Sequence, residues 1–128
     1  MLFRSRYFVP LPELERKVGA RIAELLQAPA AMVTCGAASA ISVGIAACLS
    51  QGDAAKLRRL PNREGIRYEV IQQRSHRSGY EHQMELCGAK IITVENRQEL
   101  EAAIGEKTGM MFFLNKAEPD GQIKPKSS

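Results

Sequence analysis

The first part of the chain contains two helical patterns separated by a short apolar run. Apolar residues recur at helical spacing over residues 12–27, with Pro12 in the first turn and Pro29 stopping the run, which predicts an amphipathic helix. Residues 31–34 are predicted to form a short strand. Residues 37–49 predict a helix that is apolar on nearly every side, and such a helix must be buried on several faces.

The rest of the chain alternates strands with helices. Strands are expected at residues 68–72, 90–94 and 110–114. Helices are expected between them, at residues 80–87 and 96–106. Before them, residues 52–67 are polar and basic and contain Pro61 and Gly65, so we expect a solvated loop with room for one helical turn. Four strands and the helices between them predict an α/β fold, a partial doubly wound and mainly parallel sheet with flanking helices.

Composition adds few constraints to this picture. The 128 residues allow one domain, and 18 Lys and Arg against 14 Asp and Glu give a net charge of +4, which favours anionic ligands in general. Three cysteines without a CxxC pair predict reduced thiols in a cytoplasmic protein and no metal site. The longest apolar run, residues 37–49, is too short to span a bilayer, so neither a membrane segment nor a signal peptide is expected.

Ligands of an open α/β sheet bind beyond the carboxyl ends of its strands, and the segment after the first predicted strand suits an anion. Backbone amides at the start of the following helix can donate to an anion, and side chains this small let a phosphate approach. The alternative is a close-packed turn into a buried helix. The candidate anion-binding residues are Cys35, Gly36, Ala37, Ala38 and Ser39.

The segment after the second predicted strand is rich in polar side chains. Arg74 and Arg77 can clamp a carboxylate or phosphate, and His76 can lie against an aromatic ring or move a proton. The alternative is a solvated surface loop. Asn115 directly follows the last predicted strand, and residues 116–128 have no apolar period and are predicted to be a loosely ordered tail.

Four segments together resemble a known family. LPELERKVGARIAELL, AAMVTCGAASAI, EVIQQRSHRSGYEHQMELCGAKIITVE and EKTGMMFFLN occur in an order and spacing similar to the selenocysteine synthase-like group of fold-type I pyridoxal-phosphate enzymes. That group includes L-seryl-tRNA selenium transferases and D-glucosaminate-6-phosphate ammonia-lyases. The resemblance covers residues 8–123 and implies part of an aspartate-aminotransferase-like large domain.

The resemblance also implies site roles. Residues 35–39 would form the cup for the phosphate of pyridoxal 5'-phosphate, with His76 reaching the cofactor ring. Arg74, Arg77 and Asn115 would contact the substrate, an amino acid or amino sugar phosphate. The implied reaction is α,β-elimination or replacement, with an ammonia-lyase favoured over selenium transfer, and the implied assembly is a homodimer or higher oligomer.

The chain departs from the family pattern in length. Family members continue into a strand bearing an aspartate for the pyridine nitrogen and then into the Schiff-base lysine, and no lysine here stands in that context. We therefore expect residues 1–128 to be a partial large domain, incomplete at both ends, that binds the cofactor weakly or not at all and is inactive alone.

Two alternatives to this function stay open. One is a truncated reading frame with no function of its own. The other is a nucleic-acid-binding (tRNA) fragment that uses the basic residues of the predicted loop, although no aromatic residues are interleaved with them. These basic residues are Lys56, Arg58, Arg59, Arg63 and Arg67.

Overall fold

The computed structural model describes residues 8–120 and Ile123, in two compact units, Met1–Gly36 and Ala37–Ser128. The first unit contains α1 (Leu11–Leu26), which confirms the predicted amphipathic helix to within a residue at each end. Gln27 ends it with a left-handed φ of 51°. A Cβ atom at Gly19 would collide with the carbonyl oxygen of Ala31, so this position of α1 accepts only glycine without a shift of the backbone.

The predicted strand at residues 31–34 is wrong. These residues have no regular secondary structure, and the described part of their unit contains no strand with which they can form a ladder. A β-strand needs a hydrogen-bonded neighbour, so an apolar run of four residues is not sufficient to make one.

The second unit begins with α2 (Ala37–Ser50), the predicted apolar helix. It ends where Gln51 and Gly52 take positive φ angles of 55° and 77°. The helical turn expected in the basic loop is α3 (Ala54–Arg59), whose first amides donate to the carboxylate of Asp53.

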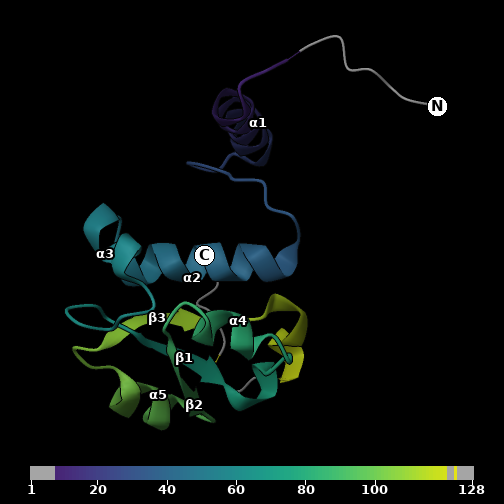
Figure 1. The fold of residues 1–128 in the computed structure, drawn as a ribbon. Coiled ribbons are helices and arrows are strands. Elements are labelled where there is room, and N and C mark those ends of the chain that lie inside the picture. Colours follow the sequence, from purple (N-terminus) through teal and green to yellow (C-terminus); the bar gives the residue numbers. More distant parts are fainter. Residues whose placement is uncertain (1–7, 121–122, 124–128) are drawn as a thin grey trace. The chain divides into compact units, whose positions relative to one another are not determined.

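A parallel sheet of three strands forms the centre of this unit (Figure 1). The strands are β1 (Glu69–Gln73), β2 (Lys90–Val94) and β3 (Thr108–Phe112), in the order β2-β1-β3. The connections carry α4 (Glu81–Glu85) and α5 (Arg97–Ala103). This arrangement confirms the predicted α/β class with a parallel sheet and flanking helices, with three strands in the described residues instead of four.

Each face of the sheet has its own hydrophobic core, because neighbouring residues of a strand point to opposite faces. Val70 faces α2 and α4, where it packs with Ile45, Leu49 and Met84. Ile71 faces the other way, towards α5, in the cluster that includes Val94 and Ile123.

The loop between α3 and β1 is fastened to the start of β2. The guanidinium of Arg63 donates to the carbonyl oxygens of Gly88, at 2.8 Å, and Ala89, at 3.5 Å, and lies over the Tyr68 ring, 5.1 Å from its centroid. Gly88 has a φ of 88°, and a Cβ there would meet the backbone of Pro61 at 2.6 Å. The predicted loop is therefore closely packed at this point rather than solvated throughout.

The segment after β3 contains a short helix where the structure describes it. Residues Asn115–Asp120 form the 3-10 helix η2. Ile123 is buried, and its backbone N–H and carbonyl pair with the side-chain amide of Gln73 at 2.8 and 2.9 Å. The rest of the tail predicted at 116–128, residues 121–122 and 124–128, lies outside the described residues. No helix in the described part is both long and apolar enough to cross a membrane.

Candidate functional site

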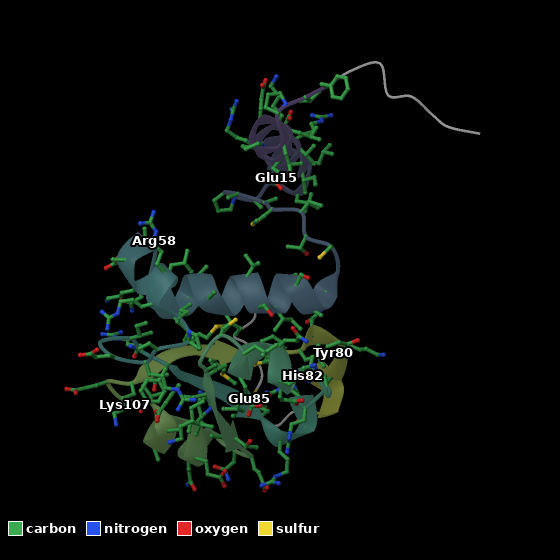
Figure 2. The ribbon with its side chains drawn as sticks, in the orientation of Figure 1. Glu15, Arg58, Tyr80, His82, Glu85 and Lys107 are labelled. Carbon is green, nitrogen blue, oxygen red and sulfur yellow. The ribbon has the colours of Figure 1, made fainter. Side chains whose placement is uncertain are left out.

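A pocket of about 480 Å³ opens at the carboxyl end of the sheet, where the sequence predicts ligand binding. Its walls come from the start of α2, the loop after β1, the end of β3 and the start of η2. Tyr80, which belongs to this wall, is marked in Figure 2. The lining residues are Ala37, Ile41, Arg77, Ser78, Tyr80, Phe112, Leu114, Lys116 and Ala117.

The loop after β1 is shaped by Glu81. Its carboxylate accepts a hydrogen bond of 2.9 Å from the backbone N–H of Ser78 and lies 3.6 Å from Nε of Arg77. Gly79 between them has a φ of 78°, which permits the tight return of the chain. Burial raises the pKa of Glu81, but the backbone N–H groups of Glu81 and Ser78 and the charge of Arg77 together lower it below the usual value. Glu81 is therefore a charged anchor for the loop.

His76 is fully buried in the second unit. It belongs to η1 (Arg74–His76), and its Nδ1 accepts the backbone N–H of Leu114 at 3.2 Å. Its ring and that of Phe113 form a T-shaped pair with centroids 4.5 Å apart. Its carbonyl accepts from Nε2 of Gln72 at 2.8 Å, while Oε1 of Gln72 has no partner among the described residues. The predicted contact of His76 with a cofactor ring would require the residues around it to move.

The residues predicted to contact the substrate do not all line the pocket. Arg77 lines the pocket. Arg74 instead pairs with Glu95 beyond β2, with 2.5 Å between Nε and Oε1, and both side chains are exposed. Asn115 begins η2 and is exposed, next to the lining residue Lys116.

The predicted phosphate cup spans the boundary between the two units. Ala37 lines the pocket, and Ala38 and Ser39 follow it, half-buried, in the first turn of α2. Cys35 and Gly36 belong to the first unit. Gly36 has a φ of 141°, a backbone conformation that residues other than glycine rarely adopt. No atom lies within 4 Å of a Cβ built there.

Sequence reasoning missed three polar lining residues, Ser78, Tyr80 and Lys116. Ser78 and Tyr80 stand within the quoted segment after β1, so their position offered the same signal as that of Arg77. Lys116 was assigned to the loose tail because residues 115–120 have no periodic pattern, whereas the structure folds them into η2.

Two observations concern metal-ligating side chains and the Cys87 thiol. No group of three His, Cys, Asp or Glu side chains gathers into a metal site within the described residues. The Cys87 thiol donates to the carbonyl oxygen of Ser42 at 3.3 Å. Burial raises the pKa of Cys87, although the hydrogen bond with Ser42 lowers it, so the thiol is the favoured form at neutral pH.

The basic residues of the α3 region are partly committed to the protein itself. Arg59 pairs with Glu64 at 3.1 Å, and Arg63 donates to the two carbonyl groups at the start of β2. Arg58, marked in Figure 2, is exposed on α3. These pairings leave a smaller set of cations for nucleic acid than the sequence indicates.

Comparison with known proteins gives two related matches. The chain is 28% identical over 116 residues to D-glucosaminate-6-phosphate ammonia lyase of Salmonella typhimurium. This match covers 84% of this chain and 31% of that protein. A solved structure of D-glucosaminate-6-phosphate ammonia-lyase matches 83% of the chain, with 30% identity and a TM-score of 0.75. No family model matches. The chain is thus homologous to D-glucosaminate-6-phosphate ammonia-lyase over about a third of the length of that protein.

Proposed function

We propose that this chain is the phosphate-binding part of a pyridoxal-phosphate-dependent lyase that removes ammonia from a phosphorylated amino sugar acid. The observation that carries the proposal is the pocket at the carboxyl end of the sheet, which brings Arg77, Lys116 and the start of α2 together. The homology to an ammonia-lyase of a sugar phosphate supports it, over 31% of the relative's length.

The residues at the start of α2 fit the phosphate of pyridoxal 5'-phosphate. The helix is 14 residues long, and the amides of its first turn, at Ala37, Ala38 and Ser39, are the natural donors for such a group. Side chains of this size leave room for it. When bound, the cofactor supplies an electron sink for the bonds at the amino-bearing carbon of the substrate.

The remaining lining residues suit a phosphorylated small molecule. Arg77 and Lys116 balance negative charge, and the Tyr80 hydroxyl can donate a hydrogen bond to a ligand oxygen. Ile41, Phe112 and other apolar side chains form a floor that keeps water from the carbon skeleton of the ligand.

We further propose that the isolated chain does not catalyse the reaction and belongs to a cytoplasmic homodimer or higher oligomer. Catalysis needs a Schiff-base lysine, and no lysine here stands in the family's context for one. Lys116 lines the pocket, but it lies in η2, shortly after β3, and not in the family's context for that lysine.

Cofactor binding tests the first proposal. In the 15N-labelled chain, pyridoxal 5'-phosphate is expected to shift the backbone amide signals of Ala37, Ala38 and Ser39, because its phosphate accepts their hydrogen bonds. Pyridoxal, which lacks the phosphate, is the control and is expected to leave these signals in place. Shifts confined to other parts of the chain, or none at the highest soluble cofactor concentration, contradict the proposal.

Inactivity of the isolated chain has a separate test. Added pyridoxal 5'-phosphate is expected to give no visible absorbance band of a protein-linked Schiff base and no ammonia from D-glucosaminate 6-phosphate. Borohydride reduction followed by peptide mapping identifies any adduct. A stoichiometric adduct at Lys116 that is absent from Lys107, an exposed lysine before β3, overturns this part of the proposal.

A further inference from the structure

The charges around the pocket are unbalanced. Two lining residues, Arg77 and Lys116, are cations, and no Asp or Glu is among the described lining residues. They come from different parts of the chain, the loop after β1 and the start of η2, so the fold is what brings them to one pocket. Glu81 does not line the pocket but lies 3.6 Å from Nε of Arg77 and offsets part of its charge, so the two lining cations together favour an anionic ligand.

Both cations keep donors for such a ligand. Nε of Arg77 lies 3.6 Å from a carboxylate oxygen of Glu81, and the Arg77 side chain is 60% exposed. Among the described residues Glu81 is the ion-pair partner of Arg77, and no ion pair or hydrogen bond of the Lys116 ammonium is found there. Glu81 is turned towards the backbone of Ser78, where it holds the loop in place.

We propose that Arg77 and Lys116 form a clamp for the phosphate of the substrate, separate from the cofactor phosphate at the start of α2. This inference rests on the proposed function, because it assigns the substrate end of that same pocket. A phosphomonoester is a dianion near neutral pH, and its oxygens accept hydrogen bonds from a guanidinium and an ammonium at the same time.

The two proposed phosphate sites differ in how exposed their donor groups are. The substrate must enter and leave in every reaction cycle, so long exposed side chains such as that of Arg77 suit its charged end. A cofactor that remains bound is better held by the fixed backbone amides of a helix terminus, which here belong to α2. Tyr80, 49% exposed, lies at the same wall and can contact the sugar hydroxyls.

Binding of a matched ligand pair to the intact chain tests the clamp. D-glucosaminate 6-phosphate is expected to bind at least about tenfold more tightly than D-glucosaminate, since the two differ only in the phosphate that the clamp holds. Isothermal titration calorimetry measures the affinities, and 15N amide shifts locate the binding. Equal affinity for the two ligands overturns the proposal.

Substitutions assign the effect to the two side chains. Arg77→Gln and Lys116→Met are each expected to weaken binding of the phosphorylated ligand about tenfold, and Lys116→Arg, which keeps the charge, is expected to retain most of it. Lys107→Met is the matched control, because Lys107 precedes β3 at the end of the strand away from the pocket (Figure 2). Wild-type affinity in both the Arg77→Gln and the Lys116→Met variants contradicts the clamp.

Pyridoxal 5'-phosphate distinguishes this inference from the proposed function. If its amide shifts at Ala37, Ala38 and Ser39 persist in the Arg77 and Lys116 variants while sugar-phosphate binding is lost, both proposals hold. If the cofactor competes for the clamp and is lost with it, the clamp serves the cofactor and the substrate assignment is wrong. If the sugar phosphate binds as expected and the cofactor causes no shift, the clamp stands and the cofactor proposal fails.

Discussion

His76 and His82 lie six positions apart and have opposite environments. His76 is fully buried, and its ring links η1 to the residues after β3. His82 is exposed on α4 (Figure 2). Its burial and its contacts give His76 a role in stabilising the fold of this chain.

Replacing His76 by alanine is expected to lower the free energy of unfolding by about 2–4 kcal/mol, because it leaves a cavity and strands the N–H of Leu114. His82→Ala, the matched control, is expected to change it by less than about 0.5 kcal/mol. Urea unfolding followed by circular dichroism measures both. Equal effects of the two substitutions contradict this role for His76.

Glu81 makes the stability of the second unit depend on pH. Its pKa is lower in the folded chain than the ordinary value of 4.5, so the unfolded chain takes up the proton first as the pH falls. The carboxylate thus stabilises the fold above pH 4.5, and this contribution is lost as the pH falls through the folded pKa.

The difference in unfolding free energy between wild type and Glu81→Gln is accordingly expected to be largest at neutral pH and to shrink below pH 4.5. Urea titrations at a series of pH values measure it. Glu85→Gln, on the exposed side of the same helix, controls for the loss of a carboxylate. A difference that stays constant with pH contradicts the anchor role of Glu81.

At the residue scale, local signals predicted part of the site. Arg77 could be placed at the pocket because it closely follows β1, and the carboxyl ends of parallel strands share one edge. Ala37 also lines the pocket, although the strand predicted before it, at residues 31–34, does not form. The burial of His76 could not be predicted, because it depends on Phe113 and Leu114, which are distant in sequence. Lys116 was missed because a 3-10 helix has no apolar repeat to reveal it.

Among the elements, α5 has the best-defined start. The Asn96 side chain accepts the N–H of Glu99 at 2.9 Å, and the Glu99 carboxylate accepts from Nδ2 of Asn96 and from the N–H of Glu95. These bonds form a capping box at the start of the helix predicted at residues 96–106, and they satisfy amides that the helix itself leaves unpaired.

Asn96→Ala is expected to destabilise the second unit by about 1 kcal/mol, since it removes this cap. Gln98→Ala, at an exposed position of the same helix, is the control and is expected to be nearly neutral. Chemical unfolding of both variants provides the comparison. If the two substitutions cost the same, the cap is not what stabilises α5.

The elements were predictable to different degrees. Residues 90–94 matched β2 because turn residues border an apolar run on both sides, whereas β3 begins two residues earlier than predicted, at Thr108. Periodicity cannot place such an end, since pairing with β1 decides it. The same limit explains residues 31–34, whose apolar pattern has no neighbouring strand to pair with in the described part of their unit.

For the molecule as a whole, the described sheet exposes two edges and several apolar side chains. β2 and β3 are the outer strands, and Val43, Leu86 and Ile104 are between 42% and 68% exposed. Unpaired edges and exposed apolar residues favour contact with other chains. This surface agrees with the proposed oligomer.

The isolated chain is therefore expected to associate with itself, with an average mass that rises with concentration in analytical ultracentrifugation. Leu86→Lys combined with Ile104→Lys is expected to reduce this association, because charge opposes apolar contact. Gln98→Lys, which adds a charge at an exposed polar position, is the control and is expected to reduce association less. A monomer at all concentrations contradicts the expectation.

The fastening of Arg63 has a consequence for digestion by trypsin, which must draw an arginine side chain into its own specificity pocket. Arg63 is held by the carbonyls of Gly88 and Ala89, and releasing it opens the contact between the loop and β2. Both arginines are exposed, but Arg63 must first give up these hydrogen bonds, so brief proteolysis with mass spectrometry is expected to show cleavage after Arg58 well before cleavage after Arg63. Early cleavage after Arg63 would contradict this. The hydrogen bonds of Arg63 thus protect the centre of the most basic segment of the chain from cleavage by trypsin.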